Sequence, residues 1–483
     1  MKQSSLLPGF AILFLLTPTN PAHAQKANLY RSIEIRNEES WQAALQIWNW
    51  AEPGYQESRS SKLLAEMLEN RGFEVKRGVA DIPTAFTATF GSGKPVIGIL
   101  GEFDALPGLT QQAVPYREAN PKLTYGHGCG HHLFGVASAS ASIAIAEQIQ
   151  AGKIKGTVRF YGTPAEEGGS AKVFMVQAGL FKDCDAVLHW HPSHRNAAGD
   201  RSSLARMAVK FRFRGKSAHA AGAPEQGRSA LDAVELCNHA SELLREHTPD
   251  LTRIHHVITS GGGAPNVVPD FAEVYFYVRH PKGEIVRDLY RRLVLCAKAA
   301  ALATETKLEV GFEGGIRELM PNNTLGRITM KNLRALNHLK YSNAEIKFAR
   351  RIQTTMSKPR SLDDIAKVYD LSGQIGRGST DVGDVSWVVP TTGFNTSCWV
   401  PGTPGHSWQA VACGGTSIAR KGMNLAAKVL AATAWDFYHN PQLLKTANAE
   451  LKRRLGNSQY KSLMNPGQKP SLDYRKPASQ RRN

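Results

Sequence analysis

The stretch "KPVIGILGEFDAL", residues 94–106, is an apolar run that ends in two acids, Glu102 and Asp104. A short apolar run of this kind is typical of a strand buried on both faces, as in a parallel sheet. Segments of helical spacing and further apolar strands alternate around it, with helices at 39–52, 58–73, 133–150 and 171–180, a strand that runs into a turn within 156–169, and a strand at 184–193. This order predicts an α/β fold with a mainly parallel sheet flanked by helices.

The pattern changes from residue 205 onward. Residues 206–216 alternate polar and apolar side chains, as an antiparallel strand with one wet face does. A helix, two strands, a long helix and a last strand follow, at 229–246, 254–260, 272–280, 284–305 and 307–314. This β-α-β-β-α-β order predicts an inserted ferredoxin-like α+β domain over 205–318. It divides a catalytic domain into 25–204 and 319–445, and a basic tail over 446–483 remains.

The chain of 483 residues is 42% hydrophobic and 21% charged, as a soluble globular protein of two domains is. Lys2, the apolar run "LLPGFAILFLL" and the triplet "AHA" form a signal-peptide pattern over residues 1–24. We expect cleavage after Ala24 and export, to the periplasm in a Gram-negative host. No later stretch is long and apolar enough to span a membrane.

The formal net charge of +18 raises the question of nucleic-acid binding. No nucleic-acid fold signature accompanies the charge, and much of the excess lies in a tail that we expect to be flexible and solvated. We therefore expect no nucleic-acid partner. Six cysteines form no CxxC pair. Export would permit a bridge between Cys398 and Cys413, which the sequence does not establish.

The stretch "GHGCGHH", residues 126–132, places Cys129 and His131 two residues apart among glycines. Glycines let the backbone bend so that both side chains could reach one ion. A structural turn and a thiolate nucleophile paired with histidine are the alternatives. The cluster alone does not choose among them.

Adjacent acids stand in "TPAEEGG", where Glu166 and Glu167 follow a strand. Neighbouring side chains on bending backbone point differently, so one can bind a metal while the other handles a proton. A solvated acidic turn is the alternative. His189 and His191 lie on one face of the strand "HWHP", and His406 lies in the loop "PGTPGHSW".

Together these residues carry more weight than each does alone. The pairs at 129/131, 166/167 and 189/191 are each expected just beyond a strand of one sheet, where open α/β sheets place their sites. Cys, His and Glu ligands suit Zn²⁺, with Mn²⁺ or Co²⁺ as alternatives, and about five ligands favour two ions. Glu166 would then deprotonate the water that attacks an amide carbonyl.

A resemblance covers nearly the whole chain after residue 24. It rests on motifs that occur in the order "GEFDALPG", "GHGCGHHLFG", "GTPAEEGG", "GKSAHAA", "GGGAPNVVPD", "GSTDVGDVSW" and "PGHSW". The chain resembles the amidohydrolase branch of the metallopeptidase family that includes carboxypeptidase G and aminoacylase. The resemblance implies a metal-dependent amidohydrolase with two divalent ions, acting on N-acyl amino acids, aminobenzoyl-glutamate-like conjugates or small peptides. It also implies that the inserted domain dimerises, with a second subunit left open.

The resemblance assigns roles to individual residues. It implies metal ligation by Cys129, His131, Glu167, His191 and His406. Glu166 matches the general base, and His219 matches a histidine that reaches across the dimer to stabilise the oxyanion. Asn266 matches an asparagine near the substrate.

Three further assignments are less direct. We assign Asp104 to orienting a ligand histidine. Arg279 could pair with a substrate carboxylate, and a surface arginine is the alternative. His132 departs from the family pattern, which has aspartate or asparagine there, and acts as a hydrogen-bond partner or a further ligand. A cysteine-dependent amide hydrolase and a non-catalytic metal- or peptide-binding protein remain as alternative functions.

Overall fold

The computed structural model describes residues 21–476, with side chains from residue 26 onward. The predicted signal peptide lies outside the described residues except for residues 21–24, which begin helix α1 (Pro21–Ile35). Within the described range, no helix combines the length and the apolar character needed to cross a membrane.

The catalytic domain is built on a mainly parallel sheet, which confirms the predicted fold class. Four central strands run parallel in the order β6 (Gly156–Gly162), β3 (Val96–Gly101), β7 (Ala186–Ser193) and β14 (Thr391–Ser397). The sheet is extended in antiparallel fashion beyond β6 by β2 (Phe86–Ser92) and β1 (Glu74–Arg77), and beyond β14 by β8 (Asn196–Ala198), which pairs in parallel with β13 (Val368–Asp370).

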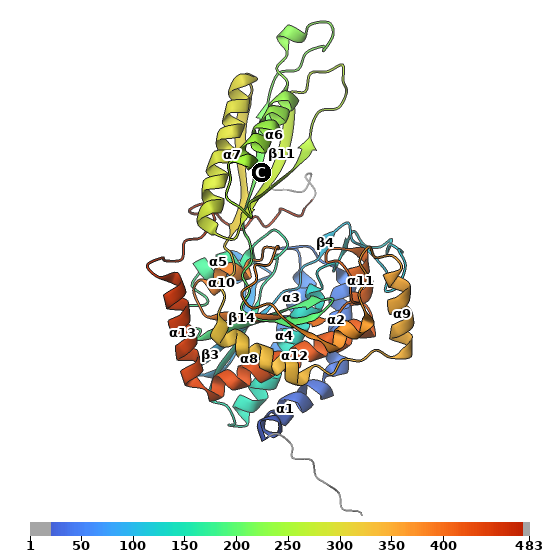
Figure 1. Ribbon diagram of the computed structural model, residues 1–483, viewed down its shortest axis with the longest axis vertical. Helices are drawn as coiled ribbons and strands as arrows, with labels where there is room; N and C mark the ends of the chain where they lie inside the picture. The colour runs from blue at the N-terminus through green and yellow to red at the C-terminus, as the bar shows by residue number, and fades with distance from the viewer. Residues whose placement is uncertain (1–20, 477–483) are drawn as a thin grey trace, which may run out of the picture.

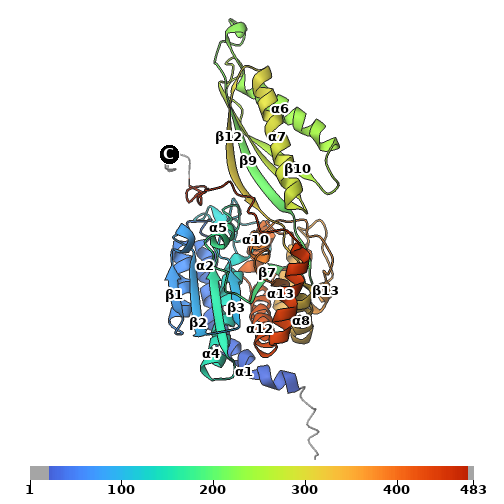
Figure 2. The ribbon, with the colours of Figure 1, turned by 90° about the vertical axis from the view of Figure 1, so that its left-hand side faces the viewer.

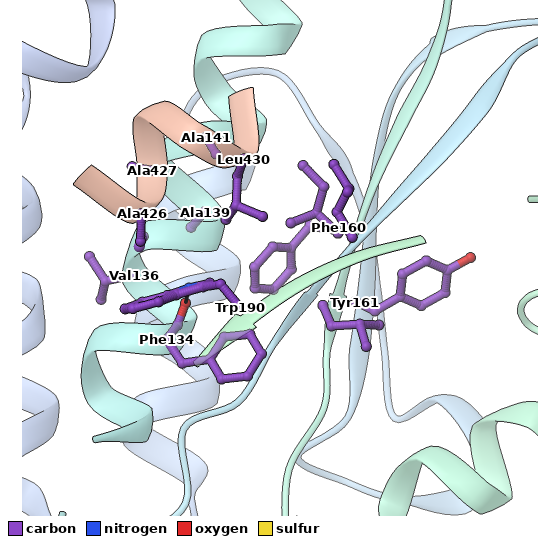
Figure 3. Packing of buried hydrophobic residues seen from close by; sticks show 14 of the residues in the cluster. Phe134, Val136, Ala139, Ala141, Phe160, Tyr161, Trp190, Ala426, Ala427 and Leu430 are labelled. Carbon is purple, nitrogen blue, oxygen red and sulfur yellow. Dashed lines mark hydrogen bonds between the residues drawn. The ribbon is translucent and has the colours of Figure 1, made fainter. Parts of the chain in front are cut away.

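Helices cover the sheet and enclose the main hydrophobic core. Helix α4 (His131–Gln150) packs on β3, β6 and β7, and α12 (Ser417–His439) packs on α4 and β14. The small Ala and Ser residues of α4 let it lie close to its neighbours, and Phe134 from this helix meets Trp190 of β7 (Figure 3). Phe160 and Trp190 are fully buried, and burying one such side chain stabilises the fold by roughly 1.5–3 kcal/mol.

The catalytic domain contains further helices and short strands. These are α2 (Asn37–Trp50), α3 (Ser58–Glu69), η1 (Val79–Asp81), β4 (Leu106–Pro107), β5 (Tyr125–Gly126), α5 (Ala171–Gln177), α8 (Asn323–Leu336), α9 (Asn343–Gln353), η3 (Leu362–Ala366), α10 (Val382–Ser386), α11 (Trp408–Gly414) and α13 (Pro441–Leu455).

The inserted domain stands out from the catalytic domain as a separate lobe (Figures 1 and 2). Its elements are β9 (Ala205–Arg214), η2 (Pro224–Gln226), α6 (Ala230–Glu246), β10 (Arg253–Ser260), β11 (Phe271–His280), α7 (Gly283–Ala303) and β12 (Lys307–Ile316). The strands form an antiparallel sheet in the order β10-β11-β9-β12, which is the expected ferredoxin-like arrangement. Alternate residues of β9 and β11, such as Phe211 and Phe276, form its own core.

The expectation of a flexible, solvated tail is wrong for residues 446–476. Leu451 anchors α13, and the chain beyond it packs across the junction of the two domains. Leu463, 1% exposed, joins the core of the inserted domain, and Met464, 5% exposed, joins that of the catalytic domain. These apolar side chains fix a segment whose overall composition is basic. Residues 456–476 are called the C-terminal segment below.

Candidate metal centre

The carboxyl ends of three adjacent parallel strands bring most of the candidate side chains together. Glu102 and Asp104 follow β3, and Glu166 and Glu167 follow β6. The histidines at 189 and 191 lie within β7 itself, near its carboxyl end, rather than beyond it as expected. Because β6, β3 and β7 are neighbours and parallel, these ends meet at one edge of the sheet.

Cys129 and His131 reach the same edge by another route, which corrects the expectation that they follow a strand of the large sheet. They come after β5, which pairs only with β4 in a separate two-stranded sheet, and His131 is the first residue of α4. Gly130 caps the helix with a φ of +77°, a conformation that glycine adopts at little cost. A Cβ at Gly126 would clash with the carbonyl of Leu109, so the turn depends on glycine here.

This region contains three overlapping sets of three residues each. Within each set, the potential ligand atoms lie within 4.8 Å of one another. The sets share members, so the six residues form one continuous cluster rather than separate sites. The sets are Cys129, His131 and His191; Cys129, Glu167 and His406; and His131, Glu166 and Glu167. All five predicted metal ligands and the predicted base are therefore brought together.

Asp104 orients two members of this cluster. Its Oδ1 accepts a hydrogen bond from Nδ1 of His131 at 2.8 Å, and its Oδ2 accepts one from the backbone N–H of Glu167 at 2.8 Å. Burial alone would raise the pKa of Asp104, but His131, the backbone N–H of Glu167 and the charge of Lys172 together outweigh burial and lower the pKa to about 2. The bond to Nδ1 leaves Nε2 of His131 as the atom that faces the other ligands.

His191 and His406 are oriented by their own surroundings. Nδ1 of His191 donates to the carbonyl of Pro192 at 2.7 Å, so Nε2 carries the lone pair and lies 3.2 Å from Sγ of Cys129. The loop that carries His406 has a left-handed backbone at this residue, with a φ of +53°. That geometry brings its Nε2 to 3.1 Å from Oε1 of Glu167.

The donor set fits divalent metal ions. Nε2 of His131 and Oε1 of Glu167 are buried and form no well-directed hydrogen bond within the described residues, although Glu102 and His406 each bring a polar atom to 3.1 Å from one of them. A buried polar atom without a partner is costly, so a bound cation would satisfy both. Thiolate, imidazole and carboxylate together are the ligands that zinc and similar ions take.

The neighbouring Glu166 carries a carboxyl group with an altered acidity. Burial, followed by the charges of Glu102 and Glu167, holds its pKa well above the usual range.

All six cysteines are free thiols, Cys398 and Cys413 included. Burial raises the pKa of the Cys129 thiol.

A buried lysine beneath the cluster was missed at the level of sequence. Nζ of Lys172 lies 2.8 Å from Glu102 and 2.7 Å from Asp381, and the lysine side chain is fully buried. Oε2 of Glu102 lies in turn 3.1 Å from Nε2 of His131. The one available signal was a lysine inside the otherwise apolar helix "AKVFMVQ".

The cluster opens into a cavity of about 580 Å³. Arg279 lies in this cavity rather than on open surface, and its Nη1 donates to Oγ of Ser379 at 3.0 Å. Four further arginines line the same cavity, and no sequence pattern had marked any of them as a candidate. They are Arg201, Arg206, Arg377 and Arg475.

Besides Asp104 and Arg279, three further predicted residues lie outside the cluster. His219 and Asn266 lie next to each other in exposed loops of the inserted domain, where the Asn266 carbonyl accepts from the N–H of Ala220, and neither lines the cavity of its own chain. His132 is buried, bonded through Nε2 to the Gly414 carbonyl at 3.1 Å, and belongs to none of the ligand sets.

Comparisons with known proteins agree with this geometry. Residues 201–305 match the family model described as peptidase dimerisation domain. The chain is 41% identical over 448 residues to one of the subunits of the p-aminobenzoyl-glutamate hydrolase of Escherichia coli, covering 87% of this chain and 93% of the relative. It is 29% identical over 439 residues to the human Xaa-Arg dipeptidase, covering 86% and 89% of the two chains.

Two solved structures share the fold. The aminobenzoyl-glutamate utilization protein from Klebsiella pneumoniae has a TM-score of 0.62 at 18% identity, covering 85% of this chain and 98% of its own. A dinuclear metal-binding peptidase of the M20 family from Bacillus subtilis has a TM-score of 0.56 at 16% identity, with 86% and 99% covered. Since the 41% identity spans almost the whole relative, this chain belongs to the M20 peptidase family.

Proposed function

We propose that this protein is an amidohydrolase that uses two divalent metal ions to cleave an amide bond of an N-acyl amino acid, an aminobenzoyl-glutamate-like conjugate or a small peptide. The observation that carries the proposal is the cluster of six Cys, His and Glu side chains whose ligand atoms lie within 4.8 Å in overlapping sets. The relatives are hydrolases of this general kind by name, which supports the reaction class.

In the proposed reaction each residue has a distinct task. Cys129, His131, Glu167, His191 and His406 would hold the ions, which are zinc or manganese, with cobalt as an alternative. When bound, the ions would polarise the amide carbonyl and make the attacking water more acidic.

Glu166 moves the proton in this scheme. Its carboxylate takes a proton from the attacking water and returns it to the leaving nitrogen, so that a neutral amine departs. Asp104 keeps His131 in the tautomer whose Nε2 can bind an ion. Arg279, inside the cavity, binds a carboxylate of the substrate.

The oxyanion would be stabilised by His219 of a second copy of the chain. His219 and Asn266 are exposed and lie outside the cavity of their own chain, as residues that act across a dimer do. The matched dimerisation domain supports a homodimer, and the name of the Escherichia coli relative leaves a second kind of subunit as an alternative. We also propose that the protein is exported after cleavage at Ala24, which fractionation of cells producing the full chain tests.

Metal analysis of the purified protein, together with a hydrolysis screen, tests the function. The screen contains p-aminobenzoyl-glutamate, N-acyl amino acids and dipeptides. We expect about two divalent ions per chain, hydrolysis that stops on chelation and returns with added metal, and a loss of roughly 100-fold or more in kcat for Glu166→Gln.

The alternatives give different results. Activity that survives complete metal removal would favour a cysteine-dependent hydrolase, and Cys129→Ser would then abolish it. Metal binding without turnover of any amide would favour a non-catalytic binding protein. Unchanged hydrolysis by Glu166→Gln would show that another group is the base.

A further inference from the structure

The C-terminal segment forms part of the wall of the cavity that holds the candidate metal ligands. It leaves α13 and runs across the junction of the two domains (Figures 1 and 2). Tyr460 donates to Oδ1 of the buried Asp384 at 2.8 Å, and Nε2 of Gln56 donates to the carbonyl of Leu472 at 2.8 Å. The segment is therefore attached at both ends of its path.

Tyr474 and Arg475, near the end of the described chain, contact the loop that carries Glu167. The hydroxyl of Tyr474 and Nη2 of Arg475 both donate to the backbone carbonyl of Glu167, at 3.0 and 2.6 Å. Tyr125 donates to the carbonyl of Arg475 at 3.3 Å. A Cβ at Gly54 would clash with the Tyr474 hydroxyl, so the catalytic domain leaves room for this segment.

The contacts within the described chain use only part of the hydrogen-bonding capacity of the Arg475 guanidinium group. Arg475 lines the cavity, and its Nε is buried without a hydrogen-bond partner among residues 21–476. The same holds for Nε of Arg206 and of Arg279, and Arg206 is only 6% exposed. Within that range no carboxylate forms an ion pair with any of the three.

Such an arrangement is costly unless a ligand completes it. An arginine that is largely withdrawn from water and forms no ion pair loses much of its hydration, and its contact with a tyrosine ring replaces only part of what is lost. An arginine fork matches a carboxylate with two parallel hydrogen bonds. Three guanidinium groups without an ion-pair partner carry more positive charge than the single carboxylate of a simple N-acyl amino acid can neutralise.

We propose that Arg475 is a specificity-determining residue, which the C-terminal segment delivers to the active site to bind a second carboxylate of the substrate. Arg279 and Arg206 then bind the first carboxylate of the substrate. The preferred substrates are then N-acyl derivatives of dicarboxylic amino acids. This inference rests on the proposed function, since it specifies the substrate class of that same site.

The test compares two substrates that differ in one charge. p-Aminobenzoyl-glutamate and p-aminobenzoyl-glutamine are assayed with the wild type, Arg475→Gln and Arg475→Lys. The control is Lys469→Gln, which removes the same charge from an exposed position of the same segment. Binding of free glutamate and glutamine is measured by calorimetry on the metal-loaded proteins, which needs no turnover.

Arg475→Gln should raise KM for the glutamate conjugate roughly 10- to 100-fold and change that for the glutamine conjugate by less than about 3-fold. Arg475→Lys should restore part of the difference, and Lys469→Gln should match the wild type. An equal loss on both conjugates, a fall in kcat alone, or no change would overturn the inference.

If no protein hydrolyses any amide, the proposed function fails and calorimetry alone decides the inference. Glutamate binding that is lost in Arg475→Gln and kept in Lys469→Gln would then support it. Equal affinities, or no glutamate binding by the wild type, would overturn it.

Discussion

Replacing Asp104 with asparagine tests how one buried carboxylate prepares the candidate metal centre. Asp104 is 1% exposed and accepts from Nδ1 of His131 and from the backbone N–H of Glu167, each at 2.8 Å. Asparagine offers one acceptor oxygen and one NH₂ group, so it cannot accept from both. Because a backbone N–H cannot reverse its role, the amide oxygen should face Glu167 and the NH₂ group should face His131.

The imidazole must then change its tautomer. Nδ1 of His131 can accept from the asparagine NH₂ only after it loses its proton, and a neutral ring then carries the proton on Nε2. That is the atom left to bind an ion: it forms no well-directed hydrogen bond within the described residues, although Oε2 of Glu102 lies 3.1 Å from it. Losing a charge-assisted hydrogen bond at a buried site costs about 1.5–3 kcal/mol, and loss of such an outer partner weakens metal affinity or activity roughly 10- to 100-fold.

Metal content and activity are measured together across a titration with the native metal. Asp104→Asn should require roughly 10- to 100-fold more free metal for half-maximal activity and keep the circular dichroism spectrum of the wild type. Asp288→Asn, an exposed position on α7 in the other domain, is the control and should change neither. Wild-type metal affinity in Asp104→Asn would refute the role of the His131 tautomer.

Three further outcomes are expected. Lys172→Met leaves two buried carboxylates without their cation and should destabilise the protein by roughly 3–5 kcal/mol in chemical unfolding, whereas an unchanged midpoint would contradict the buried ion pairs. His219→Ala and Glu166→Gln should each be inactive. Refolding a mixture of the two should recover activity, because one of the two sites in a mixed dimer then has both an intact Glu166 and an intact His219. No recovery would argue against a residue that acts across the dimer. Burial raises the pKa of Asp384 to about 7 from 3.8, so the folded state holds a proton that the unfolded state has released. Stability should therefore fall as pH rises from about 4 to about 7, and Asp384→Asn should flatten this dependence of the melting temperature; an unchanged slope would contradict it.

Most of the fold could be predicted from local patterns in the sequence. The apolar run within residues 94–106 predicts β3 because a strand buried on both faces must be apolar throughout. The same reasoning found the ferredoxin-like insert, whose β9 and β11 alternate with period two. Position relative to strand ends predicted where Glu166 and Glu167 would lie, since parallel neighbours share one edge.

Contacts between distant segments could not be predicted in this way. Cys129 and His131 were expected beyond a strand of the large sheet, but a two-stranded ribbon and a helix start deliver them. The C-terminal segment has a basic, polar composition that is typical of a solvated tail, and its two buried apolar residues, Leu463 and Met464, form no local pattern. Arg475 therefore gave no signal, because its role depends on where the rest of the chain holds that segment.

The distribution of charge within the cavity explains how such a site could orient its substrate. Three carboxylates line the cavity, those of Glu102, Glu166 and Glu167, and the buried Lys172 pairs with Glu102 and with Asp381. Five arginines line the same cavity. A substrate carboxylate is attracted by the arginines, which favours its binding on their side of the cavity. Placed in this way, the uncharged amide is the part of the substrate left facing the metal ligands and the proposed base.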